Sequence, residues 1–314
     1  MQPEILMVGP MLPQTMQSLE QTYTVHRLWE APDKPALLAQ VGPRIRGIAT
    51  TGSVGARTEI MAALPRLEVI AVFGVGVDAV DLAQARARGI ALSTTPEVLT
   101  EDVADLALAL MLSVSRRIVQ YDAYIRSGQW PKSGEPPLTH KVSRKKAGIL
   151  GLGRVGKALA QRLAALDMEV SYYDLNPAPE LPYRQADSPL ELAQHSDYFI
   201  VTAAGGAATR KLVNQEILQA IGPQGYLVNV SRGSIVDEEA LVAALKSGAL
   251  AGAGLDVFAS EPHPDPALLE MENVVLQPHM ASGTLETRTA MGQLVLANLA
   301  AHFAGKPLLT PYVW

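Results

Sequence analysis

One stretch, Lys145–Asp174, constrains this chain more than any other; it reads KKAGILGLGRVGKALAQRLAALDMEVSYYD. Its apolar residues Ala147–Leu150 predict a short buried strand, which leads directly into a glycine-rich turn. Residues Lys157–Leu166 then carry apolar side chains at helical spacing, and Met168–Tyr173 predict a second strand that ends on an acid. This order of strand, glycine turn, helix, strand and acid is the one that a dinucleotide-binding site requires.

Each glycine of the turn has a physical reason to be there. Gly151 allows the tight exit from the strand, Gly153 has no side chain to hold a pyrophosphate away from the backbone, and Gly156 lets the helix pack close to the sheet. The N-terminus of the helix would then point its free N–H groups at the phosphates. Asp174 follows Gly156 at close to the expected spacing of roughly 20 residues. Its carboxylate would accept hydrogen bonds from the ribose hydroxyls and repel a 2′-phosphate, which favours NAD over NADP, although NADP stays possible.

Length and composition exclude several classes of protein. A chain of 314 residues that is 48% hydrophobic can bury the cores of two domains. Its net charge of −5 gives no basic field for nucleic acid or an anionic membrane, and without cysteine it can form neither disulfides nor thiolate sites. No histidine pair has a zinc-binding spacing, no basic and apolar leader opens the chain, and no apolar run reaches membrane length. We therefore expect a soluble, cytoplasmic protein without a metal.

The rest of the pattern predicts an α/β protein of two domains. Residues 99–286 should form the dinucleotide-binding domain, with a six-stranded, doubly wound parallel sheet of Rossmann type. Residues 1–98 plus 287–314 should form a smaller, flavodoxin-like α/β substrate domain, since short strands alternate there with helical patterns. One long helix is expected over residues 101–126 and a loop over 127–137. A final helix is expected over 285–303.

Three chemically useful side chains follow three late strands. Arg232, Glu261 and His279 each come just after a predicted strand, and ligands of open α/β sheets bind at that edge. Reduction of a 2-keto acid needs a group that holds the carboxylate, a group that polarises the ketone and a proton donor. Arg232 offers a charged fork, His279 can donate the proton, and Glu261 could orient the imidazole. Residue types alone leave the trio open, because such arginines are often surface ion pairs and such histidines structural.

Four sequence blocks carry a resemblance that covers almost the whole chain. They are TPEVLTEDVADLAL from Thr95, GILGLGRVGKALA from Gly148, NVSRGSIVDEEALVAALKSGALAGAGLDVFASEP from Asn229 and NVVLQPHMASGTLETR from Asn273. In these blocks the chain resembles the D-isomer-specific 2-hydroxyacid dehydrogenase family. The segments VGPMLPQ and ANLAAHFAGKPLLTP are most similar to the branch of glyoxylate/hydroxypyruvate reductases and plant-type hydroxyphenylpyruvate reductases.

The resemblance implies roles for individual residues. Arg232, Glu261 and His279 would be the catalytic residues, and the protein would be a homodimer. The residues implied or predicted to contact the cofactor, beside the three glycines and Asp174, are Arg154, Val155, Val230, Asp256, His279 and Ser282. Those expected to bind the substrate, through backbone N–H groups of the FGVGVD turn and nearby side chains, are Thr51, Val75, Gly76, Val77, Arg232 and His279. Asp256 is expected to contact the nicotinamide carboxamide.

Two segments depart from the family's pattern. The turn that begins at Asp174 resembles that of NAD-using members, whereas plant-type relatives tend to use NADPH. The loop AAGGAATR, residues 203–210, replaces a usual proline and threonine where the adenosine of the cofactor is expected. We further hypothesise that the substrate pocket is shaped by Met11, Leu12, Thr51, Ser53 and Met280.

The sequence thus predicts an enzyme that reduces small 2-keto acids, hydroxypyruvate and glyoxylate foremost, to D-2-hydroxy acids. Two alternatives stay open at this point. An arylpyruvate reductase would need only a wider pocket, whose size the sequence does not give. A non-catalytic module that senses NADH, like the corepressors of this fold, would bind the cofactor without turnover.

Overall fold

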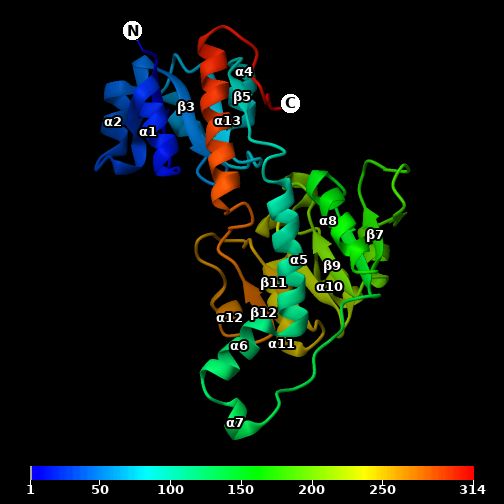
Figure 1. Cartoon of the computed structure of the whole chain (residues 1–314). Coiled ribbons are helices and arrows are strands. Elements are labelled where there is room, and N and C mark those ends of the chain that lie inside the picture. The colour runs from blue at the N-terminus through cyan, green and yellow to red at the C-terminus, as the bar shows by residue number, and fades with distance from the viewer. Residues whose placement is uncertain (1) are drawn as a thin grey trace. The chain divides into compact units, whose positions relative to one another are not determined.

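The computed structural model describes residues 2–314, which divide into two compact units. Unit 1 joins the first segment of the chain, up to Leu99, to Gly283–Trp314, and unit 2 is Thr100–Ser282. The first boundary falls one residue after the predicted one, and the second falls four residues before it. Figure 1 shows the elements of both units with the labels used below.

Unit 1 contains a five-stranded parallel sheet in the order β2-β1-β3-β4-β5, the flavodoxin-like order. Its strands are β1 (Glu4–Met7), β2 (Thr24–Arg27), β3 (Ile45–Thr51), β4 (Val69–Phe73) and β5 (Ala91–Ser93). The sequence reading missed β2, because this edge strand reads TVHR and has no fully buried residue.

Helices cover both faces of this sheet, because successive side chains of a strand point to opposite sides. Ile5 and Met7 of β1 pack toward α1 and α13, whereas Leu6 lies in the core beneath α2, α3 and α4. Gly292 of α13 lies so close to α1 that an added Cβ would meet Thr15 Oγ1 at 2.1 Å. The helices are α1 (Pro13–Thr22), α2 (Lys34–Val41), α3 (Thr58–Ala62), α4 (Leu82–Ala87) and α13 (Leu285–Phe303).

Unit 2 contains a seven-stranded parallel sheet in the order β12-β11-β10-β9-β6-β7-β8. The first six strands of this unit in chain order give the 3-2-1-4-5-6 arrangement of dinucleotide-binding folds. The sequence predicted six strands in this sheet, and the prediction was wrong by one. The missed strand is β8, which is two residues long, exposed at both positions and without an apolar pattern. The strands are β6 (Lys146–Leu150), β7 (Glu169–Tyr173), β8 (Arg184–Gln185), β9 (Tyr198–Val201), β10 (Tyr226–Asn229), β11 (Gly252–Leu255) and β12 (Val274–Leu276).

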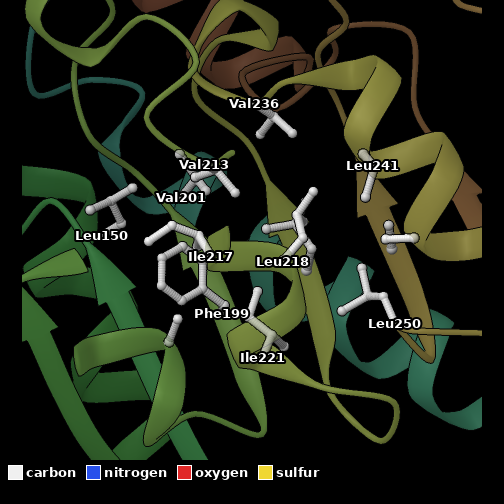
Figure 2. Close-up of a cluster of buried hydrophobic side chains, with 14 of the residues drawn as sticks. Leu150, Phe199, Val201, Val213, Ile217, Leu218, Ile221, Val236, Leu241 and Leu250 are labelled. Carbon is white, nitrogen blue, oxygen red and sulfur yellow. The ribbon is translucent and has the colours of Figure 1, made fainter. Parts of the chain in front are cut away.

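A core of unit 2 lies between one face of this sheet and four helices, and Figure 2 shows part of it. Phe199 and Val201 of β9 pack there against Ile217, Leu218 and Ile221 of α10. Truncation of such a buried leucine or isoleucine to alanine typically costs about 2–5 kcal/mol. The helices of unit 2 are α5 (Thr100–Arg116), α6 (Ile118–Arg126), α7 (Trp130–Ser133), α8 (Arg154–Ala165), α9 (Pro189–Gln194), α10 (Gln215–Ile221), α11 (Glu238–Ser247) and α12 (Pro266–Leu269).

Helix α5 packs against α8 and strands β10, β11 and β12. Glycines in β11 allow this approach, since a Cβ on Gly254 would meet Leu110 Cβ at 2.9 Å. The single helix expected over 101–126 is wrong: it ends at Arg116, Arg117 takes a left-handed conformation with φ of 50°, and α6 starts afresh. The loop expected over 127–137 likewise contains the short helix α7. Within residues 2–314, no helix combines the length and apolarity that a membrane crossing needs.

Candidate active site

The glycine turn of unit 2 has the geometry that its sequence predicts. β6 ends at Leu150, Gly151 takes a φ of 97°, and α8 begins at Arg154 with Gly153 as its N-cap. A Cβ on Gly151 would meet the backbone of Ala203 at 2.5 Å, and one on Gly156 would meet the Gly151 carbonyl oxygen at 2.3 Å. Both positions therefore exclude any other residue.

Gly153 differs from its two neighbours, because a Cβ there would have no atom within 4 Å. The space in front of it is open, at the N-terminus of a helix whose first N–H groups lack intrahelical partners. The residues present thus fit the pyrophosphate of a dinucleotide, which the turn at Gly153 and the start of α8 at Arg154 and Val155 would hold. Such a cofactor would supply a hydride at its nicotinamide ring.

Asp174 stands at the end of β7, beside the glycine turn. Its Oδ2 accepts a hydrogen bond of 2.7 Å from Leu152 N, and its Oδ1 accepts one of 2.8 Å from Asn176 N. The carboxylate is partly exposed and held next to the turn, so its remaining lone pairs can accept hydroxyl donors. This is the position from which an acid binds the adenosine ribose.

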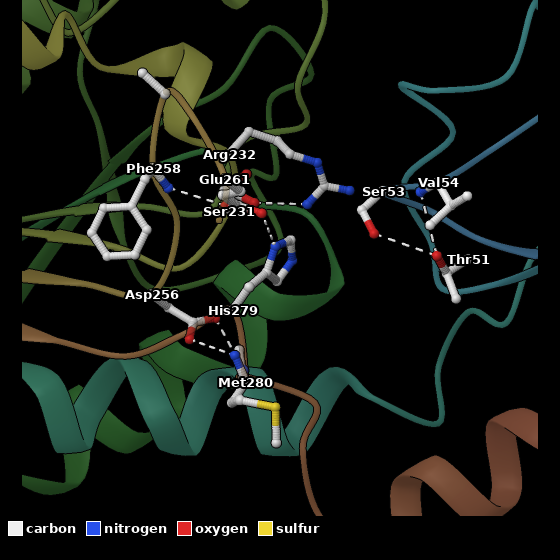
Figure 3. Close-up of polar contacts among 12 residues, drawn as sticks. Thr51, Ser53, Val54, Ser231, Arg232, Asp256, Phe258, Glu261, His279 and Met280 are labelled. Carbon is white, nitrogen blue, oxygen red and sulfur yellow. Dashed lines mark hydrogen bonds and ion pairs between the residues drawn. The ribbon is translucent and has the colours of Figure 1, made fainter. Parts of the chain in front are cut away.

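Arg232, Glu261 and His279 follow β10, β11 and β12, which are neighbours at one edge of the sheet. Figure 3 shows their side chains pointing toward one another. The arrangement agrees with the strand-end argument, since the carboxyl ends of parallel strands meet at the same edge.

The imidazole of His279 is bonded to Glu261, with 2.7 Å between Nδ1 and Oε2. The other carboxylate oxygen of Glu261 accepts a hydrogen bond of 3.1 Å from Phe258 N. Burial raises the pKa of Glu261, but the hydrogen bond from His279 and the charges of His279 and Arg232 outweigh it, so that the pKa lies below its ordinary value. An ionised carboxylate only accepts hydrogen bonds, so Nδ1 donates to it and Nε2 is the nitrogen left for substrate.

The backbone around Arg232 is fixed by side chains of the preceding segment. Asn229 Nδ2 donates to the Arg232 carbonyl oxygen over 3.0 Å, and Asn229 Oδ1 accepts from Ser231 N over 3.1 Å. The guanidinium donates from Nη1 to the Ser231 carbonyl oxygen over 2.7 Å. A guanidinium is planar and always charged, and its fork of N–H donors matches the geometry of a carboxylate or a ketone oxygen.

In unit 1, the FGVGVD turn follows β4 and is held at its start by a buried threonine. Thr95 Oγ1 accepts from Gly74 N over 3.0 Å, and Thr95 N donates to the Gly74 carbonyl oxygen over 2.8 Å. In residues 2–314 no acceptor is bonded to the backbone N–H groups of Val75, Gly76 and Val77. Three free donors in succession are suited to an anion, which is the use predicted for this turn.

The other predicted substrate and pocket residues lie partly in unit 1 and partly in unit 2. Thr51 Oγ1 contacts Ser53 Oγ at 3.3 Å and accepts from Val54 N at 3.3 Å (Figure 3). Met11 is buried, whereas Met280, next to His279, is 46% exposed. The pocket role proposed for these residues and for Leu12 stays a prediction.

The remaining predicted cofactor residues have different environments. Val230 is buried at the end of β10, and Ser282 is half-buried at the end of unit 2. Asp256 is fully buried and both of its carboxylate oxygens accept backbone N–H groups, from Met280 and Ala281. In the segment 203–210, the Ala203 carbonyl oxygen accepts a short hydrogen bond from Ser231 Oγ.

Sequence reasoning missed several residues that hold the predicted functional segments of each unit. Thr95 fixes the glycine turn of unit 1, Asn229 fixes Arg232, and Glu238 Oε2 accepts from Ala259 N over 2.9 Å in the loop that carries Glu261. The sequence contained only part of the information needed to single these residues out. A polar residue at the end of a buried strand, such as Asn229, could have been singled out, but the backbone partner that it binds could not.

Comparisons with known proteins agree with this geometry. Residues 108–281 match the family model described as "D-isomer specific 2-hydroxyacid dehydrogenase, NAD binding domain". The chain is 44% identical over 309 residues to glyoxylate/hydroxypyruvate reductase A of Arabidopsis thaliana, covering 98% of both chains. It is 45% identical over 309 residues to the hydroxyphenylpyruvate reductase of Plectranthus scutellarioides, again covering 98% of both.

A solved structure is similar over the full length. It is the NADPH-dependent glyoxylate/hydroxypyruvate reductase of Sinorhizobium meliloti in complex with NADP and malonate, with a TM-score of 0.95 and 41% identity. The match covers 100% of this chain and 97% of that one. The family model, the relatives matched over nearly their full length and the geometry of the glycine turn lead to one conclusion. The chain belongs to the D-isomer-specific 2-hydroxyacid dehydrogenase family and is a nicotinamide-dependent oxidoreductase of 2-keto acids.

Proposed function

We propose that this enzyme reduces glyoxylate and hydroxypyruvate to the corresponding 2-hydroxy acids, with NADH as the preferred reductant. The observation that carries the chemistry is the hydrogen bond between His279 Nδ1 and Glu261 Oε2. The names of the Arabidopsis and Sinorhizobium relatives support the choice of substrates.

The side chains divide the work of the reduction as follows. Arg232 binds the carboxylate and the ketone oxygen of the substrate, and its charge stabilises negative charge that develops on that oxygen. Protonated His279 donates the proton on Nε2 to the same oxygen as the carbonyl carbon is reduced. Glu261 keeps Nδ1 as the donor to itself, so that the proton on Nε2 is the one transferred.

The decisive experiment is a panel of keto acids assayed with NADH and with NADPH. We expect the highest kcat/KM for hydroxypyruvate or glyoxylate. A second candidate, reduction of arylpyruvates, is favoured by the name of the Plectranthus relative. A higher kcat/KM for 4-hydroxyphenylpyruvate than for hydroxypyruvate would replace the first proposal with this one.

The preference for NADH rests on the carboxylate of Asp174, which Leu152 N and Asn176 N hold beside the glycine turn. A fixed negative charge there repels a 2′-phosphate and accepts hydroxyl donors. Asp174→Ser should therefore lower the KM for NADPH and raise that for NADH. The control is Glu180→Gln, which removes an exposed carboxylate after the same strand. A wild-type enzyme that already prefers NADPH, like its Sinorhizobium relative, would overturn the preference.

We also propose that the enzyme is a homodimer, and a cytoplasmic location stays a prediction. Helix α6 exposes Ile118, Val119 and Ile125, each more than half accessible, and Trp130 of α7 is 56% exposed. Such a group of exposed apolar side chains is typical of a protein–protein interface. The double substitution Ile118→Asp with Ile125→Asp should halve the mass measured by sedimentation. Leu269→Asp on α12 is the matched control, and a monomeric wild type would contradict the proposal.

A further inference from the structure

Asp256 is the only fully buried carboxylate among residues 2–314, with 0% exposure at the end of β11. Its Oδ1 accepts a hydrogen bond of 2.7 Å from Met280 N, and its Oδ2 accepts one of 3.0 Å from Ala281 N. Its backbone carbonyl oxygen accepts a third, of 2.8 Å, from His279 N. Asp256 therefore accepts hydrogen bonds from three successive N–H groups of one loop, and Figure 3 shows its carboxylate facing Met280.

The loop that donates these bonds has an unusual backbone. His279 has a φ of 55°, in the left-handed region that residues with a Cβ seldom occupy. Such a conformation persists only where the surroundings hold it in place, and it is typical of functional sites. The three bonds to Asp256 are the contacts that hold it here, immediately at and after the strained residue.

The chemistry of a carboxylate suits this task better than that of any neutral side chain. Its two oxygens accept and do not donate, so both can face N–H groups. An amide in its place would turn an NH2 group toward one of the two backbone donors. Burial raises the pKa of Asp256 above its ordinary value, while the hydrogen bonds from Met280 N and Ala281 N act against that rise.

We propose that Asp256 is a positioning residue, whose carboxylate holds the 279–281 loop in the conformation that brings the His279 imidazole to Glu261. This inference rests on the proposed function of His279 as proton donor. It is distinct from the role in binding the nicotinamide carboxamide that the resemblance implies for Asp256, because a positioning role acts through the backbone N–H groups of Met280 and Ala281. The two roles predict different effects of the same substitution.

The test is a double-mutant cycle of Asp256→Asn and His279→Gln, with kcat for hydroxypyruvate and the Kd for NADH measured in each variant. Alone, Asp256→Asn should lower kcat by about a hundredfold, the loss typical of a misplacement of about 1 Å. In the His279→Gln background it should lower kcat by no more than about twofold, because the group that it positions is gone. The Kd for NADH should stay unchanged in both backgrounds.

Other outcomes overturn the proposal. A full loss of kcat from Asp256→Asn in the His279→Gln background, or a weaker Kd for NADH, would assign Asp256 to the cofactor instead. Asp256→Ser, which places no NH2 group against the backbone donors, repeats the cycle should the Asn variant fail to fold by circular dichroism. Failure of both variants to fold would make Asp256 a residue of the fold and sink the local role.

A measurement without substrate separates this proposal from the proposed function. In proton–nitrogen spectra of the imidazoles, the His279 signal is identified by its absence from His279→Gln. The Nδ1 proton bonded to Glu261 should shift or vanish in Asp256→Asn, and an unchanged signal would refute the positioning role. If the wild type reduced no keto acid, the proposed function would fail while this spectrum still tested the loop.

Discussion

Two clusters in this molecule contain the same three residue types and serve different ends. In unit 2, Arg232, Glu261 and His279 come together; in unit 1, Arg46 donates to both oxygens of Glu68, which His302 Nε2 contacts at 3.3 Å. Arg232, Glu261 and His279 follow the carboxyl ends of their strands, whereas Glu68 precedes β4 and Arg46 lies at the start of β3. Position along the strand, more than residue type, separates the candidate active site from the structural cluster.

The use of the carboxylate also differs between the clusters. Glu68 binds its arginine through two hydrogen bonds of 2.7 and 2.8 Å, and that arginine lies over the Phe303 ring at 5.2 Å. Glu261 divides its oxygens between a backbone N–H and the imidazole of His279. Both carboxylate oxygens of Glu68 bind one arginine, which is suited to stability, whereas Glu261 orients an imidazole, which is suited to catalysis.

The largest difference between the clusters should appear in kcat when the histidine of each cluster is replaced by glutamine. His279→Gln removes the proton donor and should lower kcat by roughly 10²–10⁴, the usual contribution of general acid catalysis. His302→Gln is the matched control and should leave kcat unchanged. Steady-state kinetics with NADH and hydroxypyruvate measure both, and near-normal turnover in His279→Gln would remove the basis of the comparison.

Replacement of the two arginines by alanine should affect different properties, catalysis for Arg232 and thermal stability for Arg46. Arg232→Ala should raise KM for the keto acid and lower kcat, with a loss in kcat/KM of roughly 10- to 100-fold from lost charge-assisted hydrogen bonds. Arg46→Ala should instead lower the thermal midpoint and leave kcat/KM unaltered. The result against this view would be an Arg232→Ala enzyme with wild-type KM and kcat.

The smallest effect concerns Glu68 and depends on pH. The hydrogen bond from Arg46 is the main cause that lowers the pKa of Glu68, with a smaller one from His302 and some opposition from burial. A lowered pKa in the folded state means that the pair stabilises the fold above the ordinary glutamate value and ceases to do so as pH falls through the lowered value. Because both side chains are 37% exposed, we expect less than about 1 kcal/mol.

The measurement is chemical denaturation of wild type and Glu68→Gln at neutral pH and at about pH 3. The difference in unfolding free energy should be present at neutral pH and disappear at the acid value. Glu59→Gln, on the exposed face of α3, controls for the loss of one negative charge. A difference that grows toward acid pH would contradict the assignment.

The glycine turn and the strand-end residues could be predicted because their chemistry is local. Gly151, Gly153 and Gly156 stand in a pattern whose spacing reflects one turn and one helix start, and the final helix 285–303 has the predicted bounds. Arg232, Glu261 and His279 were found from a rule about parallel sheets that needs only the order of strands. These parts of the fold and site follow from short stretches of sequence.

What could not be predicted depends on the backbone. The break at Arg117 follows the apolar run that ends at Val114, and no glycine or proline marks it, because Ser115, Arg116 and Arg117 are all compatible with a continued helix. Strands β2 and β8 lie at sheet edges, where a few polar residues suffice for pairing. The hydrogen bonds of Asp256 depend on the left-handed backbone at His279, and a histidine in the sequence does not predict that conformation.

The last helix has a consequence for synthesis of the chain. Met291, Val295 and Leu299 of α13 complete the core that Ile5 and Met7 begin, although all of unit 2 is translated between them. At a translation rate of about 5–20 residues per second, α13 is synthesised on the order of ten seconds or more after the first strands. A nascent N-terminal unit therefore leaves the ribosome with one apolar face bare, and chaperones have time to bind it there before the fold closes.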